Sequence, residues 1–164
     1  MLFCGLLTSG QASAEIYALL MFIGDYKAGI QKLEGVQHDV PTARKIAHML
    51  GVKDANIQLL QNNELTLEGM QNAFDELDRR VEVGDRVFIY YSGHGGRQYV
   101  REPEERCAES LITVNGIGFS DAELESRLQK LSGQAQKVIA MLDSCHSVTT
   151  RGVRNLRYTS TLSG

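Results

Sequence analysis

The chain has 164 residues, a length that suits one domain with a single sizeable core. Its hydrophobic content of 43% and charged content of 23% are ordinary for a globular protein, and its net charge of -3 gives no basic footprint for nucleic acid. The three cysteines form no CxxC pair, which argues against a zinc ribbon or a thioredoxin-type motif.

The first residues match part of a targeting sequence. Residues 2–7 are apolar, and residues 12–14 have the A-x-A form of a signal-peptidase site. The apolar part is short and no basic residue precedes it, so two interpretations stay open. Residues 1–14 are either the remnant of a signal peptide, which predicts a periplasmic or secreted protein, or a ragged N-terminus on a cytoplasmic one. No run approaches the roughly 20 apolar residues that a membrane-spanning helix needs.

The first strand and the first helix are predicted from apolar patterning. Residues 15–23 form a compact apolar run that indicates a strand, and residues 24–38 indicate a loop. Residues 39–51 then predict a helix that begins with Asp39 as its N-cap and stops at Gly51.

A second strand–helix unit and a third strand follow. Residues 56–60 predict a short strand, residues 66–81 a helix, and residues 87–91 a buried strand that is apolar, β-branched and aromatic. Residues 96–110 are polar and irregular, and we expect a small surface hairpin within them.

The last predicted elements lead to the end of the chain. Residues 111–114 indicate a short strand, and a capping-box pattern at residues 120–123 opens a helix that runs to Leu131. Residues 137–142 form another apolar strand, and residues 148–164 indicate a loop.

This order of elements predicts an α/β fold with a mostly parallel sheet and helices on both faces. The last strand is left at an edge that nothing further along the chain covers. We therefore expect the chain to be a fragment, or the first part of a longer protein.

Reactive side chains follow two of the strands at once. His94 comes after the strand over residues 87–91, and Cys145 after the strand over residues 137–142. Because sites in open α/β sheets form beyond the carboxyl ends of the strands, we expect the two to meet. A thiolate attacks an acyl carbon, and a nearby imidazole takes the thiol proton and later protonates the leaving amine. Asp143 lies two residues before the cysteine and faces the same crevice.

The two motifs carry a family resemblance. Tyr91-Ser-Gly-His-Gly95 and Asp143-Ser-Cys-His-Ser147 resemble the signatures of the caspase-like cysteine peptidases, in their metacaspase form. His94 and Cys145 lie 51 positions apart, near the interval of about 50 given for caspases. The resemblance implies a three-layer caspase-like fold, in which residues 15–164 are the large-subunit part of the catalytic domain and the C-terminal part is absent.

The resemblance also implies roles for individual residues. Cys145 would be the nucleophile, His94 the general acid/base, and the N–H groups of Gly95 and Cys145 the oxyanion hole. Asp39 matches the metacaspase aspartate that helps to line the primary specificity pocket. Together with Asp143 it would favour a cationic side chain, so we expect an endopeptidase that cuts protein or peptide substrates after Arg or Lys.

Further expectations concern processing and cofactors. The basic run over residues 151–157 offers self-cleavage sites, and a C-terminal small-subunit region of the same precursor is an expected partner. Many metacaspases bind calcium through aspartates, but the matching stretch here, residues 101–109, carries glutamate. The acidic residue expected after the nucleophile is absent as well. We expect no cofactor, and calcium activation is left open but not favoured.

Competing interpretations remain at this stage. The domain could be an inactive caspase-like scaffold or a regulatory interaction domain. Asp39 could serve only as a helix N-cap. A zinc site from His94, Cys145, His146 and Asp143 is chemically conceivable, but ligands adjacent in sequence form a poor tetrahedron, so no metal site is expected.

Overall fold

A four-stranded parallel sheet forms the centre of the computed structural model, which describes residues 14–27, 29–100, 106–144 and 148–149. The strands lie in the order β2-β1-β3-β7. Their near-continuous apolar runs are typical of parallel strands that are buried on both faces. The bounds are β1 Ile16–Phe22, β2 Ile57–Gln61, β3 Arg86–Ser92 and β7 Lys137–Asp143.

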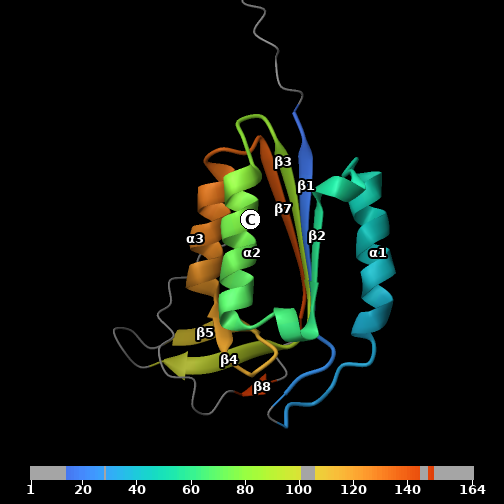
Figure 1. Cartoon of the computed structure of the whole chain (residues 1–164). Coiled ribbons are helices and arrows are strands. Elements are labelled where there is room, and N and C mark those ends of the chain that lie inside the picture. The colour runs from blue at the N-terminus through green and yellow to red at the C-terminus, as the bar shows by residue number, and fades with distance from the viewer. Residues whose placement is uncertain (1–13, 28, 101–105, 145–147, 150–164) are drawn as a thin grey trace, which may run out of the picture.

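Helices cover both faces of this sheet (Figure 1). Helix α1 (Val36–Met49) packs on one face, where it shares a core with Leu20 and Phe88. Helices α2 (Leu67–Arg80) and α3 (Asp121–Ser132) pack on the other. Two 3-10 turns, η1 (Asp54–Asn56) and η2 (Asn62–Glu64), flank β2. The predicted three-layer α/β fold with a mostly parallel sheet is therefore confirmed.

A second sheet lies beside the carboxyl ends of the first (Figure 1). Its order is β6-β5-β4-β8, with antiparallel β4–β5 and β5–β6 pairs and a parallel β4–β8 pair. The bounds are β4 Gly95–Val100, β5 Arg106–Ile112, β6 Gly118–Ser120 and β8 Val148–Thr149. Because β4 begins three residues after the end of β3, the segment that carries His94 lies where the chain passes from the first sheet to the second.

The prediction for residues 96–114 was only partly right. A hairpin is present, but β4 and β5 pair regularly over six positions, and the strand expected at residues 111–114 is the end of β5. Ala108, Ser110 and Ile112 are buried on one face of β5 and Leu111 is buried on the other, so the apolar residues of the strand do not alternate and the period-2 signal is weak. The loop expected from residue 148 onward was wrong at residues 148–149, which pair with β4.

The N-cap of helix α1 lies four residues earlier than predicted. It is Gly35, which makes no side-chain capping bond, so the assignment of Asp39 as N-cap was wrong. Val36 is buried with Ala43 and Ala47, and this buried face extends the helix by one turn toward its start. Gly51, at φ +91°, ends the helix as expected.

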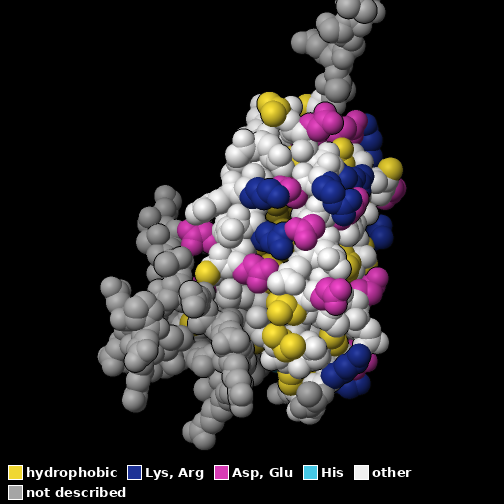
Figure 2. Space-filling view, turned by 60° about the vertical axis from the view of Figure 1, so that its left-hand side comes forward, with side chains coloured by type: hydrophobic (Ala, Val, Ile, Leu, Met, Phe, Trp, Pro, Cys, Tyr) yellow, Lys and Arg dark blue, Asp and Glu magenta, His cyan; other side chains and the backbone are white. Residues whose placement is uncertain are grey.

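The outer surfaces of α2 and α3 are held together by polar pairs. Arg127 on α3 pairs with Asp75 on α2, and Lys130 Nζ lies 2.6 Å from Asp78 Oδ2. Figure 2 shows acidic and basic side chains interspersed over this side of the molecule. In each pair one side chain is exposed and the other is largely covered, and the opposite charges neutralise one another locally.

Among the described strands, β7 forms one edge of the parallel sheet. Its side chains are mostly exposed, including Met141 at 43% and Leu142 at 41%. The predicted uncovered edge is therefore present in the described part of the chain. Within that part, no helix has the length and apolar content needed to cross a membrane. The predicted targeting segment, residues 1–14, falls outside the described residues except for Ala14.

Candidate active site

The backbone of His94 is fixed between the two sheets. His94 follows β3 by two residues and is 4% exposed. Its N–H donates to the Tyr26 hydroxyl over 2.7 Å. Its carbonyl accepts from the N–H of Ile112 over 2.9 Å and from the Tyr91 hydroxyl over 3.0 Å. Three hydrogen bonds therefore set the position from which the imidazole projects.

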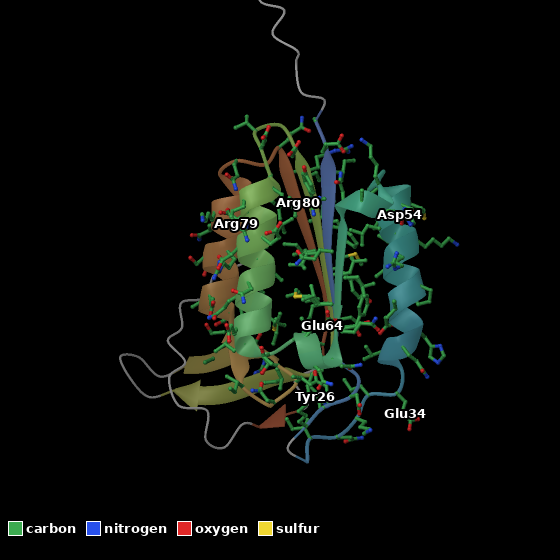
Figure 3. All side chains as sticks on the ribbon, viewed as in Figure 1. Tyr26, Glu34, Asp54, Glu64, Arg79 and Arg80 are labelled. Carbon is green, nitrogen blue, oxygen red and sulfur yellow. The ribbon has the colours of Figure 1, made fainter. Side chains whose placement is uncertain are left out.

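The imidazole of His94 is oriented by the loop between β1 and α1. Its Nε2 lies 2.8 Å from the backbone carbonyl oxygen of Gln31. Since a carbonyl only accepts, Nε2 carries the proton in this bond. In the neutral ring, Nδ1 is then the basic nitrogen. The Tyr26 ring packs against the imidazole with the centroids 4.7 Å apart, and Figure 3 labels Tyr26 at this end of the sheet.

Three of the predicted site residues line one cavity of about 670 Å³ at the carboxyl end of the parallel sheet. His94, Asp39 and Asp143 come from the ends of β3, α1 and β7. They meet there because parallel strands all end at the same edge. The remaining wall is formed by residues 31–36 with Ser92 and Gly93.

The two carboxylates are each held by a neighbouring hydroxyl. Ser92 Oγ donates to Asp39 Oδ2 over 2.7 Å. The Tyr90 hydroxyl lies 3.5 Å from Asp143 Oδ2. Burial, followed by the negative charges of Asp39 and Asp143, raises the pKa of Tyr90 to about 12, so its hydroxyl stays protonated and available as a donor. Two acidic groups therefore face one concave space, which favours a cationic guest.

The remaining predicted site residues are placed only in part. Gly95 is buried and starts β4, where it pairs with Leu111. Cys145 and His146 lie outside the described residues. Asp143, the last residue of β7, pairs with Ser92 in the parallel register. Cys145 follows Asp143 by two positions in the sequence. Most of the stretch considered for calcium, residues 101–105, also falls outside the description, as does the side chain of Cys107.

A second, smaller cavity of about 440 Å³ shares lining residues of the loop segment 32–36 with the first. It opens at the ends of β1 and β2 and is lined by Phe22, Gln37, Gln61 and Asn62 among others. The Asn62 side-chain oxygen accepts from the N–H groups of Gly24 (3.0 Å) and Asp25 (2.9 Å). Asn62 thereby ties down the start of the loop that carries Gln31.

Several residues of the site were not predicted. Gln31 acts through its backbone carbonyl, and because every residue has one, its role cannot be predicted from residue type. The pattern of apolar and polar residues gives no indication that the Ser92 hydroxyl binds Asp39. Tyr26 lies in a segment without periodicity, and Tyr90 was assigned to the core. The one available signal was that Ser92 and Tyr90 fall within the motif Tyr91-Ser-Gly-His-Gly95 or next to it.

Comparison with known proteins gives consistent results. The sequence model of the caspase domain matches residues 16–161. The chain is 28% identical over 144 residues to Metacaspase-1 of Mycosarcoma maydis, covering 81% of this chain and 35% of that protein. It is 26% identical over 139 residues to Metacaspase-7 of Arabidopsis thaliana, covering 79% of this chain and 34% of that protein. The chain thus spans about a third of the length of these curated relatives.

A solved structure shares the fold. The crystal structure of a structural-genomics target from Geobacter sulfurreducens superposes with a TM-score of 0.66 at 26% sequence identity. The match covers 82% of this chain and 52% of that one.

Proposed function

This chain belongs to the caspase-domain family, whose metacaspase members suggest cysteine peptidase activity, and on that basis we propose that it is a cysteine endopeptidase with Cys145 and His94 as its catalytic dyad. One observation carries the proposal. His94 is buried at the end of β3 with Nε2 bound to a carbonyl, and β7, the strand paired with β3, leads to Cys145. Because Nε2 is engaged by the Gln31 carbonyl, the proposal assigns the proton exchange with the Cys145 thiol to Nδ1.

The chemistry follows from this arrangement. Nδ1 of His94 takes the proton of the Cys145 thiol, and the thiolate attacks the acyl carbon of the scissile peptide bond. The oxyanion would be stabilised by the N–H groups of Gly95 and Cys145. The imidazolium then gives its proton to the leaving amine, and water hydrolyses the remaining thioester. The Gln31 carbonyl stabilises the imidazolium and keeps the ring from rotating.

The charge of the cavity supports a specificity for Arg or Lys on the acyl side of the cut. Asp39 and Asp143 face the same space as His94 and are held by Ser92 and Tyr90. A guanidinium matches carboxylates through paired charge-assisted hydrogen bonds, so Arg should be preferred to Lys. An aspartate side chain in the same position would be repelled.

The dyad is tested with fluorogenic peptides that end in Arg, Lys or Asp before the reporter, on the full-length protein with and without calcium. We expect turnover of the Arg and Lys peptides and none of the Asp peptide. His94→Ala and Cys145→Ala should each lose activity, with the histidine variant falling by roughly 10²–10⁴-fold. Absence of turnover by the intact protein would instead favour an inactive caspase-like scaffold.

The specificity is tested with Asp39→Asn. Loss of one charge-assisted contact should lower kcat/KM for the Arg peptide by about 10- to 100-fold. Asp54→Asn is the matched control, because Asp54 is 80% exposed and lies away from the cavity. Equal kcat/KM values for the Asp39 variant and the wild type would remove Asp39 from the specificity pocket.

Two partner proposals accompany the activity. Arg151, Arg154 and Arg157 would be self-cleavage sites; they lie outside the described residues, and intact-mass comparison with Cys145→Ala tests them. The exposed edge of β7, with Met141 and Leu142, is consistent with pairing to a C-terminal small-subunit region of the same precursor. Identical intact masses for the wild type and Cys145→Ala would argue against self-cleavage at these arginines.

A further inference from the structure

Two tyrosine hydroxyls enclose the backbone on both sides of His94. The Tyr26 oxygen accepts from the N–H of His94 over 2.7 Å, while the Tyr91 hydroxyl donates to the carbonyl of His94 over 3.0 Å. The two hydroxyls lie 3.4 Å from each other, and both contact the carbonyl oxygen of Ile112. Burial raises the pKa of Tyr26, so its hydroxyl remains protonated and makes both bonds at neutral pH.

The residue before His94 is fitted to these hydroxyls. A Cβ atom on Gly93 would lie 2.7 Å from the Tyr26 oxygen and 2.6 Å from the Tyr91 oxygen. These distances are below van der Waals contact, so glycine is required here by packing. The backbone of residues 93–94 is thus pressed against the two hydroxyls with no space to shift toward them.

Tyr26 also contacts the imidazole itself. Its ring packs on that of His94 with a centroid distance of 4.7 Å, and it is only 7% exposed. Tyr91 forms a hydrogen bond with the backbone of His94, and Gln31 forms one with its ring nitrogen. Tyr26 restrains both the backbone and the imidazole ring of His94. Its hydroxyl anchors the N–H, and its ring limits rotation about the Cβ–Cγ bond.

We propose that Tyr26 is a positioning residue that holds the His94 imidazole in the orientation in which Nδ1 meets the Cys145 thiol. This inference rests on the proposed dyad. It assigns to Tyr26 an effect on the reactive pair that is separate from its part in the core. Deleting the hydroxyl should loosen the imidazole and weaken its stabilisation of the thiolate, so the thiol pKa should rise.

The test is the pH dependence of Cys145 alkylation by iodoacetamide, followed by mass spectrometry of the full-length protein. In Tyr26→Phe we expect the acid limb to move upward by about one pH unit. We also expect kcat per titrated active site to fall about tenfold with KM within about twofold, part of the roughly 10²–10⁴-fold that a positioned acid/base supplies. A purely structural role would lower the number of titratable sites and leave the pH profile in place.

Two variants bracket this result. Tyr17→Phe deletes a hydroxyl on β1 at the opposite end of the sheet, where the Tyr17 ring lies under Arg80, and should match the wild type. His94→Ala should move the alkylation profile further than Tyr26→Phe. The other charged groups that line the cavity with His94 are unchanged in all of these variants: Lys32, Glu34, Asp39 and Asp143.

Each outcome decides a separate point. If His94→Ala shifts the profile and Tyr26→Phe does not, Tyr26 has no positioning role and the dyad stands. If neither shifts it, the dyad is wrong and the inference falls with it. Should Tyr26→Phe fail to fold, 4-fluorophenylalanine incorporated at position 26 takes its place, because the fluorine fills the space of the hydroxyl but does not donate and accepts poorly, so the same upward shift is expected. An unchanged profile in that variant would overturn the inference.

Discussion

At the scale of single residues, Tyr91 is a buried hydroxyl whose ionisation the fold opposes. The side chain is fully buried and donates to the carbonyl oxygens of His94 and Ile112. Burial raises the pKa of Tyr91 well above its ordinary value of 10, with the nearby Tyr26 as a second cause. The pKa values of Tyr26 and Tyr90 are raised as well.

These shifts predict a loss of stability at alkaline pH. The pKa of Tyr91 is higher in the folded state than in the unfolded state, so the unfolded state releases the proton first as the pH rises. The contribution of the protonated tyrosine to the free energy of unfolding is therefore fully present below pH 10 and is lost above it. The free energy of unfolding should fall by up to about 1.4 kcal/mol per pH unit for each such tyrosine. Urea unfolding between about pH 8 and pH 11 measures the slope.

Tyr91→Phe should make this slope shallower, at a cost of about 1 kcal/mol near neutral pH for the lost hydrogen bonds. Ile89→Val is the matched control, because it changes the same core strand without a titratable group. That control should lower the unfolding free energy by about 0.5–1.5 kcal/mol equally at every pH. An alkaline slope in Tyr91→Phe as steep as in the wild type would contradict the prediction.

At the scale of elements, helix α2 begins with a capping threonine. Thr66 Oγ1 accepts from the N–H of Gly69 over 3.0 Å, and Met70, Phe74 and Leu77 are buried on one face of the helix. Thr66→Ala removes the cap and should cost about 1 kcal/mol of unfolding free energy. Urea denaturation of the two proteins measures the difference.

The control for Thr66→Ala is Thr42→Ala. Thr42 lies inside α1, is exposed, and bonds only back to the His38 carbonyl among its described contacts. A threonine in this setting stabilises a helix little, so its replacement should change the unfolding free energy by less than about 0.5 kcal/mol. Equal losses for both variants would show that capping is not the cause.

The two long helices on the α2–α3 face were predicted almost to the residue, whereas α1 was not. Thr66 and Ser120 cap their helices through the third following N–H, a local pattern that is readable in the sequence. The start of α1 depends instead on the burial of Val36 in the core cluster that contains Leu20 and Phe88, residues that are distant along the chain. Asp39 has the residue type of an N-cap, but in the fold its carboxylate binds Ser92.

At the scale of the whole molecule, one core joins the two sheets. Phe74 on α2 stacks on Phe119 of β6 with centroids 5.6 Å apart and planes 11° apart. Both rings are fully buried in the cluster that contains Leu19 and Ile112. The second sheet, and with it the segment that carries His94, is therefore anchored to the parallel sheet through α2.

Phe74→Ala should cost about 3–5 kcal/mol of unfolding free energy, since it leaves a large cavity between the helix and both sheets. Val83→Ala is the control, because Val83 is 90% exposed, and it should stay within about 0.5 kcal/mol of the wild type. Thermal and urea unfolding measure both. A loss below about 1 kcal/mol in Phe74→Ala would mean that the two sheets do not share a core.

The sequence by itself determined the strands β1, β3 and β7, the helices α2 and α3, and the delivery of His94 and Asp143 to one edge. It did so because buried parallel strands are continuous apolar runs, caps are local, and parallel strands end together. Only the tertiary structure decided that the Gln31 carbonyl holds the imidazole, that Ser92 binds Asp39 and that Tyr26 packs on His94. Every residue has a carbonyl and most surfaces have hydroxyls, so which of them becomes a partner depends on how a loop without periodicity closes over the sheet.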